Sequence, residues 1–239
     1  MRKFLLAIAF LCGAVFAQPS ESDLAIWPRS YFASIGFNVI ANRGDFFDHT
    51  VKIQNKDGLN ETIHLPKNRV LLSPDYNLGV NVREFTFALS FQYWSTLGSI
   101  EGLPAEKADQ DMSYWRFGFE ATYNFFYPER FQVGVGLGYS FSSFSIENNA
   151  VSEKGFFDSS LKGSAFAIVT NIRYYITDFF ALSPSLRIYE TWYKSVNTDN
   201  CGTIEFNKKN NGVMDHNSYL GQTYIAMSIN AMREQISTV

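Results

Sequence analysis

The sequence predicts an all-β protein, a single up-and-down antiparallel β-barrel of about eight strands. Segments in which apolar residues alternate with small or polar ones recur along the chain, and a period of two is typical of strands. Tight turns and long polar segments follow these strands in alternation. Aromatic residues make up 17% of the 239 residues. One soluble core of this size would struggle to hold so many rings, so part of them is expected on an outer surface.

The clearest strand runs from Phe131 to Ser143 and reads FQVGVGLGYSFSS. Its odd-numbered positions through Phe141 are apolar, and its even-numbered positions are Gln, Gly or Ser. Neither face carries a charge, whereas a strand with one face in water would be expected to carry several. The other predicted strands are 31–39, 69–82, 84–94, 115–125, 164–176, 180–193 and 222–230.

The connections predict the order of the strands around the barrel. Tight turns are expected at YPER (127–130), at TDFF (177–180) and near Arg83, while 42–68, 96–111, 147–161 and 196–218 are long and polar. Short turns at one end and long loops at the other are typical of outer-membrane barrels, which have short periplasmic turns and long extracellular loops. Pro184 interrupts one predicted strand and requires a bulge or an unpaired position there.

The distribution of charge predicts which face meets lipid. The apolar positions of 85–93, 115–125 and 131–141 contain no Lys, Arg, Asp or Glu. A charge facing mid-bilayer costs about 2–4 kcal/mol for Arg or Lys, so the apolar face is expected to meet lipid and the polar face a narrow lumen. The charged residues expected in that lumen are Asp75, Glu84, Arg116, Glu120, Arg173 and Arg187.

A soluble barrel that holds a small apolar ligand is the alternative. It would turn its apolar side chains inward and carry charge on its outer surface, about 25–35% Asp, Glu, Lys and Arg. The segment 131–143 has no charge on either parity, which favours the membrane barrel.

Aromatic residues cluster at the ends of the predicted strands. Trp and Tyr are enriched at membrane–water interfaces because their rings are apolar and their tips polar. The sequence therefore predicts an interfacial aromatic belt of Trp27, Tyr93, Trp94, Tyr114, Trp115, Trp192, Tyr193 and Tyr219.

The first residues predict export. A basic start is followed by the apolar run Phe4–Ala17, and Val15 and Ala17 precede Gln18 as the small residues that signal peptidase reads. The run is 14 residues long, shorter than the roughly 20 that a membrane-spanning helix needs. The predicted division is 1–17 signal peptide, 18–30 N-terminal segment, 31–232 barrel and 233–239 tail.

The strand pattern from Tyr31 to Met232 resembles the small bacterial outer-membrane β-barrel proteins, the OmpA-like and OmpW-like eight-stranded group. The resemblance implies location in the bacterial outer membrane, contact with its lipids, and assembly by periplasmic chaperones and the barrel assembly machinery. It also implies that an extracellular ligand could contact the loops. Members commonly end at an aromatic residue, whereas this chain continues to Val239.

The expected role is structural or surface-interacting, with a lumen filled by side chains. The alternatives are a porin-like barrel that passes small solutes or hydrophobic molecules and, less favoured, a lipid-modifying enzyme. No enzyme activity, cofactor or metal site is expected: His49, His64 and His216 form no zinc spacing, and Asp215-His216-Asn217-Ser218 is ordinary loop chemistry. A net charge of −3 implies no nucleic acid partner.

Overall fold

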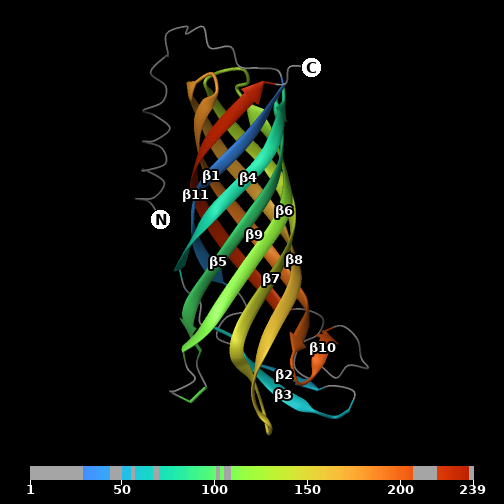
Figure 1. The fold of residues 1–239 in the computed structure, drawn as a ribbon. Helices are drawn as coiled ribbons and strands as arrows, with labels where there is room; N and C mark the ends of the chain where they lie inside the picture. Colours follow the sequence, from blue (N-terminus) through green and yellow to red (C-terminus); the bar gives the residue numbers. More distant parts are fainter. Residues whose placement is uncertain are drawn as a thin grey trace, which may run out of the picture.

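The computed structural model describes residues 29–43, 50–54, 57–66, 70–100, 103–104, 109–206 and 220–236. They form eleven strands, and no described helix is long and apolar enough to cross a membrane. Eight long strands make the wall (Figure 1): β1 (Arg29–Arg43), β4 (Val70–Val82), β5 (Phe85–Ser99), β6 (Asp109–Phe125), β7 (Phe131–Ser152), β8 (Gly155–Thr177), β9 (Phe180–Thr198) and β11 (Leu220–Ile236).

The wall is a closed ring. Each of its strands pairs antiparallel with the next along the chain, and β1 pairs with both β4 and β11, which closes the barrel. The strands run obliquely to the barrel axis (Figure 1). The predicted fold class is confirmed, and the first and last strands are longer than predicted, since β1 begins at Arg29 and β11 ends at Ile236.

Short turns join the strands at one end, here called the short-turn end. They lie between Val82 and Phe85, Phe125 and Phe131, and Thr177 and Phe180, where tight turns were predicted. Arg83 and Phe126 adopt positive φ values of 50° and 64°, a conformation that reverses the chain within few residues.

The opposite end, here called the long-loop end, differs from the prediction. The segment 147–161 is not a polar loop: β7 continues to Ser152, β8 begins at Gly155, and a two-residue turn joins them. The register shifts between Ile146 and Ala150 at a bulge. Because a bulge interrupts the alternation of side chains, a search for a strict period of two did not recognise this part of the strand.

Three short strands fold within the other long connections. The hairpin of β2 (Thr50–Gln54) and β3 (Asn60–His64) pairs with β7 through Thr62↔Val151 and Ile63↔Ala150, and β10 (Gly202–Glu205) pairs with β9. All three lie at the long-loop end in Figure 1.

Prolines interrupt the wall at two places. Between β8 and β9 the register pairs Asn171 with Ser185 and Tyr174 with Leu182 and skips the positions between, where Pro184 has no N–H to donate. Of the two predicted possibilities, a bulge or an unpaired position, Pro184 shows the second on its β8 side, whereas on its other side it pairs with Ile229 of β11. Between β4 and β5 the pairing ends at Asp75↔Gln92, directly beside Pro74, although β4 continues to Val70 and β5 to Ser99.

Candidate functional site: the filled interior and the apolar wall

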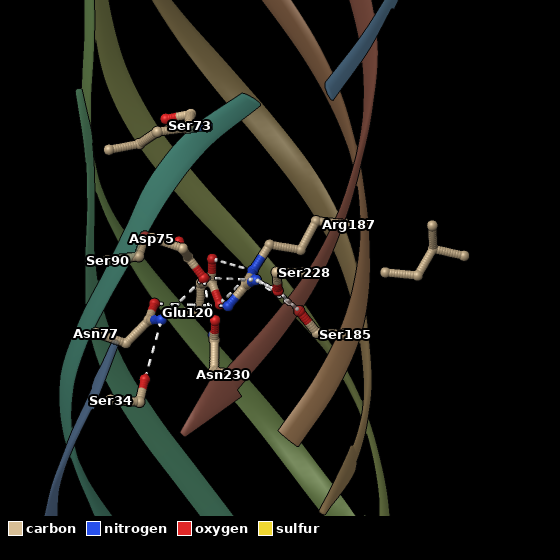
Figure 2. A network of polar contacts seen from close by, with 12 residues as sticks. Ser34, Ser73, Asp75, Asn77, Ser90, Glu120, Ser185, Arg187, Ser228 and Asn230 are labelled. Atoms are coloured by element: carbon tan, nitrogen blue, oxygen red, sulfur yellow. Dashed lines mark hydrogen bonds and ion pairs between the residues drawn. The ribbon is translucent and has the colours of Figure 1, made fainter. Parts of the chain in front are cut away.

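Inward-facing charges meet inside the barrel in what we call the central cluster (Figure 2). Arg187 Nε donates to Glu120 Oε1 and Oε2 at 2.9 and 3.1 Å, and its Nη1 lies 3.2 Å from Asp75 Oδ2. These residues stand on β9, β6 and β4, so the cluster ties distant parts of the ring together. Arg187, Glu120 and Asp75 are 5%, 5% and 0% exposed.

Polar side chains complete the central cluster. Asn230 Nδ2 and Asn77 Nδ2 donate to Asp75 Oδ2 at 2.8 and 3.1 Å, and Arg187 Nη1 donates to Ser185 Oγ and Ser228 Oγ at 2.7 and 3.2 Å. Buried charges are tolerated when they are paired and hydrogen-bonded in this way.

A second guanidinium lies beside the cluster. Arg116 Nη1 donates to Ser90 Oγ at 3.0 Å, and its Cζ lies 4.5 Å from the ring centroid of Tyr189. Tyr189 in turn donates its hydroxyl to Glu120 Oε1 at 3.3 Å. Two guanidinium groups and two carboxylates therefore share this section, which balances its charge.

A separate set of contacts, which we call the lower cluster, lies nearer the short-turn end, the upper end in Figure 1. Glu234 accepts from Tyr175 Oη at 2.6 Å and from Ser30 Oγ and Asn81 Nδ2 at 2.9 Å each. Arg173 Nη1 donates to Asn81 Oδ1 at 3.1 Å, so the arginine and the carboxylate share Asn81.

Five of the six charged residues expected in the lumen lie in the interior: Asp75, Arg116, Glu120, Arg173 and Arg187. The prediction for Glu84 is wrong. It stands in the turn between β4 and β5 and is half-buried there, because the strand begins one residue later, at Phe85. Sequence reasoning also missed Glu234, which was assigned to a tail. The alternation of Ser228, Asn230 and Met232 continues through it and could have found it.

Towards the long-loop end the interior becomes apolar. The β2–β3 hairpin lays Val51, Ile53 and Ile63 over the mouth of the barrel, each 1% exposed. We call this packed region the outer core; its members also include Ile40, Leu65, Trp94, Ile100, Met112, Tyr114, Phe144, Ile146, Leu161, Tyr193, Val196, Ile204 and Phe206.

Polar contacts fix the hairpin on the barrel. The Glu61 carboxylate of β3 accepts from Thr198 Oγ1 at 2.6 Å and from Asn200 Nδ2 at 2.8 Å. Asn149 Nδ2 of β7 donates to the backbone oxygen of His64 at 2.9 Å. Because Glu61 is only 2% exposed, water competes little for these bonds.

We expect Glu61→Ala to loosen the hairpin without unfolding the barrel. The variant loses two hydrogen bonds to a buried carboxylate, each about 1.5–3 kcal/mol, and leaves their donors without that acceptor. Amide hydrogen exchange within 50–64 should accelerate, while exchange in β6 stays as in the wild type. Unchanged exchange in the hairpin would contradict the role of this contact.

The predicted aromatic belt requires correction. Trp94, Tyr114 and Tyr193 face inward and are 9%, 3% and 0% exposed. They belong to the outer core, where the ring centroids of Trp94 and Tyr114 lie 5.5 Å apart. Each lies an even number of residues from an inward-facing neighbour on its own strand, as Trp94 does from Gln92. The prediction of the belt overlooked this alternation.

The remaining belt residues have different positions. Tyr93 and Trp115 are 48% and 43% exposed on the outer face and pair with each other across β5 and β6. Trp192 is half-buried, and Trp27 and Tyr219 lie outside the described residues.

The outer face of the wall is apolar over a broad band. Contiguous exposed apolar surface of more than a few hundred Å² marks a surface that meets a partner or a membrane. Large side chains at least 36% exposed occur on every strand of the ring, and they include Ile35, Phe37, Leu78, Phe87, Leu89, Phe117, Phe119, Leu137, Phe141, Ile168, Ile188, Met227 and Ile229.

A row of small polar residues ends this band towards the long-loop end. Ser95, Ser113, Ser145, Ser160 and Asn197 pair in sequence across β5, β6, β7, β8 and β9. Beyond them stand exposed Asp111, Glu147, Asp158 and Asp199. On β6, β7, β8 and at the end of β9 the outer face therefore changes from apolar to acidic within a few residues.

Candidate metal ligands and the histidines are the described residues that bear on a possible metal or catalytic site. No group of three or more His, Cys, Asp or Glu among them is arranged to hold a metal ion. His64 ends β3, whereas His49 and the segment 215–218 lie outside the described residues.

Comparisons with known proteins place the chain beside outer-membrane proteins of solved structure. No protein-family model matches it, and no curated protein sequence matches it significantly. Neisserial surface protein A is 12% identical with a TM-score of 0.48, over 85% of this chain and 96% of that one. OprG of Pseudomonas aeruginosa is 11% identical with a TM-score of 0.49, over 87% and 96%. The outer-membrane protease OmpT of Escherichia coli is 12% identical with a TM-score of 0.44, over 90% and 100%.

Proposed function

We propose that this protein is an integral β-barrel of the bacterial outer membrane with a closed lumen and a structural or surface-interacting role. The observation that carries the proposal is the inverted distribution of polarity: Leu137 is 54% exposed on the outer face, while Arg116 is 1% exposed inside. If water surrounded the barrel, the exposed Leu137 and the buried Arg116 would both be unfavourable. Lipid around the barrel makes the exposure of Leu137 favourable.

The closed barrel and the predicted signal peptide support a location in the outer membrane. Pairing around the closed ring leaves no strand of the wall with a free edge, which is the condition for crossing lipid with strands. The predicted signal peptide at 1–17 would direct the chain out of the cytoplasm, and barrels of this kind belong to outer membranes.

Membrane fractionation tests the location. We expect the protein to remain with the outer membrane after high-salt and alkaline washes and to migrate differently in SDS gels before and after boiling, because the closed barrel resists SDS at room temperature. Release by the alkaline wash would mark a peripheral protein and refute the proposal.

The interior supports a closed lumen in place of a pore. The central cluster, the lower cluster and the outer core occupy successive sections of the barrel, and the β2–β3 hairpin covers its mouth. The surface at the long-loop end, formed by the hairpin, β10 and the end of β7 and β8, is then the part that can contact partners outside the cell.

We expect no steady ion conductance from the wild-type protein in planar bilayers, since Arg187 spans the lumen between Glu120 and Asp75. A variant that empties this section, Arg187→Ala with Glu120→Ala, is the control and should open brief conducting events. Conductance of the wild type at the level of the variant would favour a porin-like role.

One observation favours a second candidate function, the passage of hydrophobic molecules through the wall. Backbone pairing between β4 and β5 ends beside Pro74, so the seam towards the long-loop end is held by contacts such as Ser73 Oγ to the Tyr93 backbone oxygen at 3.3 Å. A loosened seam between an apolar outer core and lipid would be a lateral route.

Uptake of an alkane by lipid vesicles tests this candidate. Pro74→Val restores an N–H and should allow further pairing, so it should slow uptake if the seam is the route. Uptake no faster than in protein-free vesicles would eliminate the candidate and leave the closed barrel.

A further inference from the structure

A groove lies in the outer face of the wall near the short-turn end, and we call it the wall groove. Its volume is about 480 Å³. It crosses β1, β4, β5 and β6, which lie side by side in the ring (Figure 1). The outward-facing side chains that line it are all large and apolar or aromatic: Tyr31, Leu78, Val80, Phe87, Leu89 and Phe119.

The depth of the wall groove within the barrel follows from the strand register. Phe32, Gly79 and Ala88 also line it and pair in one row across β1, β4 and β5. Gly79 stands three residues before Val82, where β4 ends, which is roughly 10 Å along the strand. Half of a bilayer's hydrocarbon core is about 15 Å thick, so in the proposed membrane location the groove opens to the leaflet on the short-turn side.

Two exposed arginines stand beyond the wall groove at the short-turn end. Arg29 begins β1, two residues from Tyr31 on the same face, and pairs with Val82 of β4. Arg83 follows Val82 in the turn to β5. Neither guanidinium group forms a salt bridge with a described carboxylate, although Glu84 is the next residue of that turn. Positive charge without a protein partner therefore adjoins an apolar groove.

Charge decides which occupant fits this surface. The acyl chains of the bilayer are as apolar as the side chains of the groove, so apolar contact alone selects no partner. Guanidinium groups bind phosphate strongly and with two parallel hydrogen bonds. Arg233, exposed on β11 beside Ala33 of β1, adds further positive charge on this side of the barrel.

A second copy of the chain fits the surface less well. Two copies related by a two-fold axis along the bilayer normal would bring the same patch of each copy together at the same depth. Arg29 and Arg83 of one copy would then approach those of the other, and like charges repel.

We propose that the wall groove, together with Arg29 and Arg83, binds one glycerophospholipid with an anionic head group in the leaflet on the short-turn side. An acyl chain lies in the groove against Leu78 and Leu89, and the head-group phosphate accepts hydrogen bonds from the two arginines. The site rests on the proposed membrane location and adds to it a specific lipid partner.

Native mass spectrometry of the folded protein in detergent tests the site by lipid titration. The probes are phosphatidylglycerol, which is anionic, and phosphatidylcholine with the same acyl chains, which has no net charge. We expect the first phosphatidylglycerol to bind about 25-fold more tightly than the first phosphatidylcholine, since each of the two arginines contributes roughly a factor of five. Equal affinities for the two lipids would overturn the proposal.

A pair of double variants separates a site from general charge attraction. Arg29→Gln with Arg83→Gln should lower the affinity for phosphatidylglycerol to that for phosphatidylcholine. Lys154→Gln with Lys162→Gln removes the same net charge at exposed positions towards the long-loop end and should keep the preference. The same loss in both double variants would contradict a site at the arginines.

A bulky substitution tests the part of the site that takes the acyl chain. Val80→Trp fills the wall groove and should weaken the first binding of both lipids at least fivefold, whereas Ile229→Trp, on the outer face of β11 outside the groove, should not. If Val80→Trp does not fold, Leu89→Trp makes the same test. Binding as tight as in the wild type in whichever variant folds would contradict the groove as the acyl-chain site.

The lipid site and the membrane location fail in different ways. A protein that stays with the outer membrane after the alkaline wash but shows no preference for phosphatidylglycerol loses only the lipid site. Release by the alkaline wash would refute the membrane location and the lipid site with it.

Discussion

Leu137→Arg should destabilise the barrel in lipid by about 2–4 kcal/mol, the cost of a cationic side chain near the bilayer midplane. Leu137 lies on the outer face, 54% exposed, and pairs with Ala121 of β6 and Ile168 of β8. The substituted guanidinium would face hydrocarbon on all sides. Reversible urea titration of the protein in lipid vesicles measures the change in the free energy of unfolding.

Ser145→Arg is the matched control, since it makes the same change on the same strand and the same face. Ser145 belongs to the polar row that ends the apolar band, where an arginine should cost at most about 1 kcal/mol. Equal destabilisation by both variants would mean that the cost is steric or general, and the lipid-facing assignment would lose its support.

Arg187→Met should cost about 3–5 kcal/mol, because it leaves the buried carboxylates of Glu120 and Asp75 without the cation that bonds both. Methionine approximates the length of the arginine stem, so the lost charge dominates over lost packing. The same urea titration in vesicles measures the effect.

A triple variant that combines Arg187→Met with Asp75→Asn and Glu120→Gln separates the effect of charge from that of side-chain shape. It replaces both unpaired carboxylates by amides of the same size, so it should recover most of the lost stability. A triple variant as unstable as Arg187→Met alone would show that packing around Arg187, and not its charge, holds this section together.

The wall of the barrel was predictable because one physical rule governs it. In a strand between lipid and a narrow lumen the side chains must alternate, and Leu137 and Gly138 follow this rule as directly as any pair in the chain. Gly138 and its even-numbered neighbours face inward, where Gly136 has no room for a side chain because an added Cβ would overlap the Ala121 backbone oxygen.

The outer core was not predicted because its burial depends on contacts between segments that lie far apart in the sequence. Val51 and Ile53 alternate over only five residues within a long polar segment, too few to be told from an ordinary loop. Trp94 was assigned to the interface from its residue type. Its parity indicated the interior, but an apolar interior became recognisable only when the hairpin was seen to cover it.

The central claim is that the apolar face meets lipid, and nitroxide accessibility tests it most directly. Single spin labels at Leu137, Ile168, Ser145 and Ser160 would be compared in a Cys201→Ser background, with oxygen as the apolar relaxation agent and a nickel chelate as the aqueous one. We expect labels at Leu137 and Ile168 to respond strongly to oxygen and weakly to nickel, and labels at Ser145 and Ser160 to show the reverse. Nickel accessibility at Leu137 and Ile168 equal to that at Ser145 would place the apolar face in water and contradict the membrane barrel.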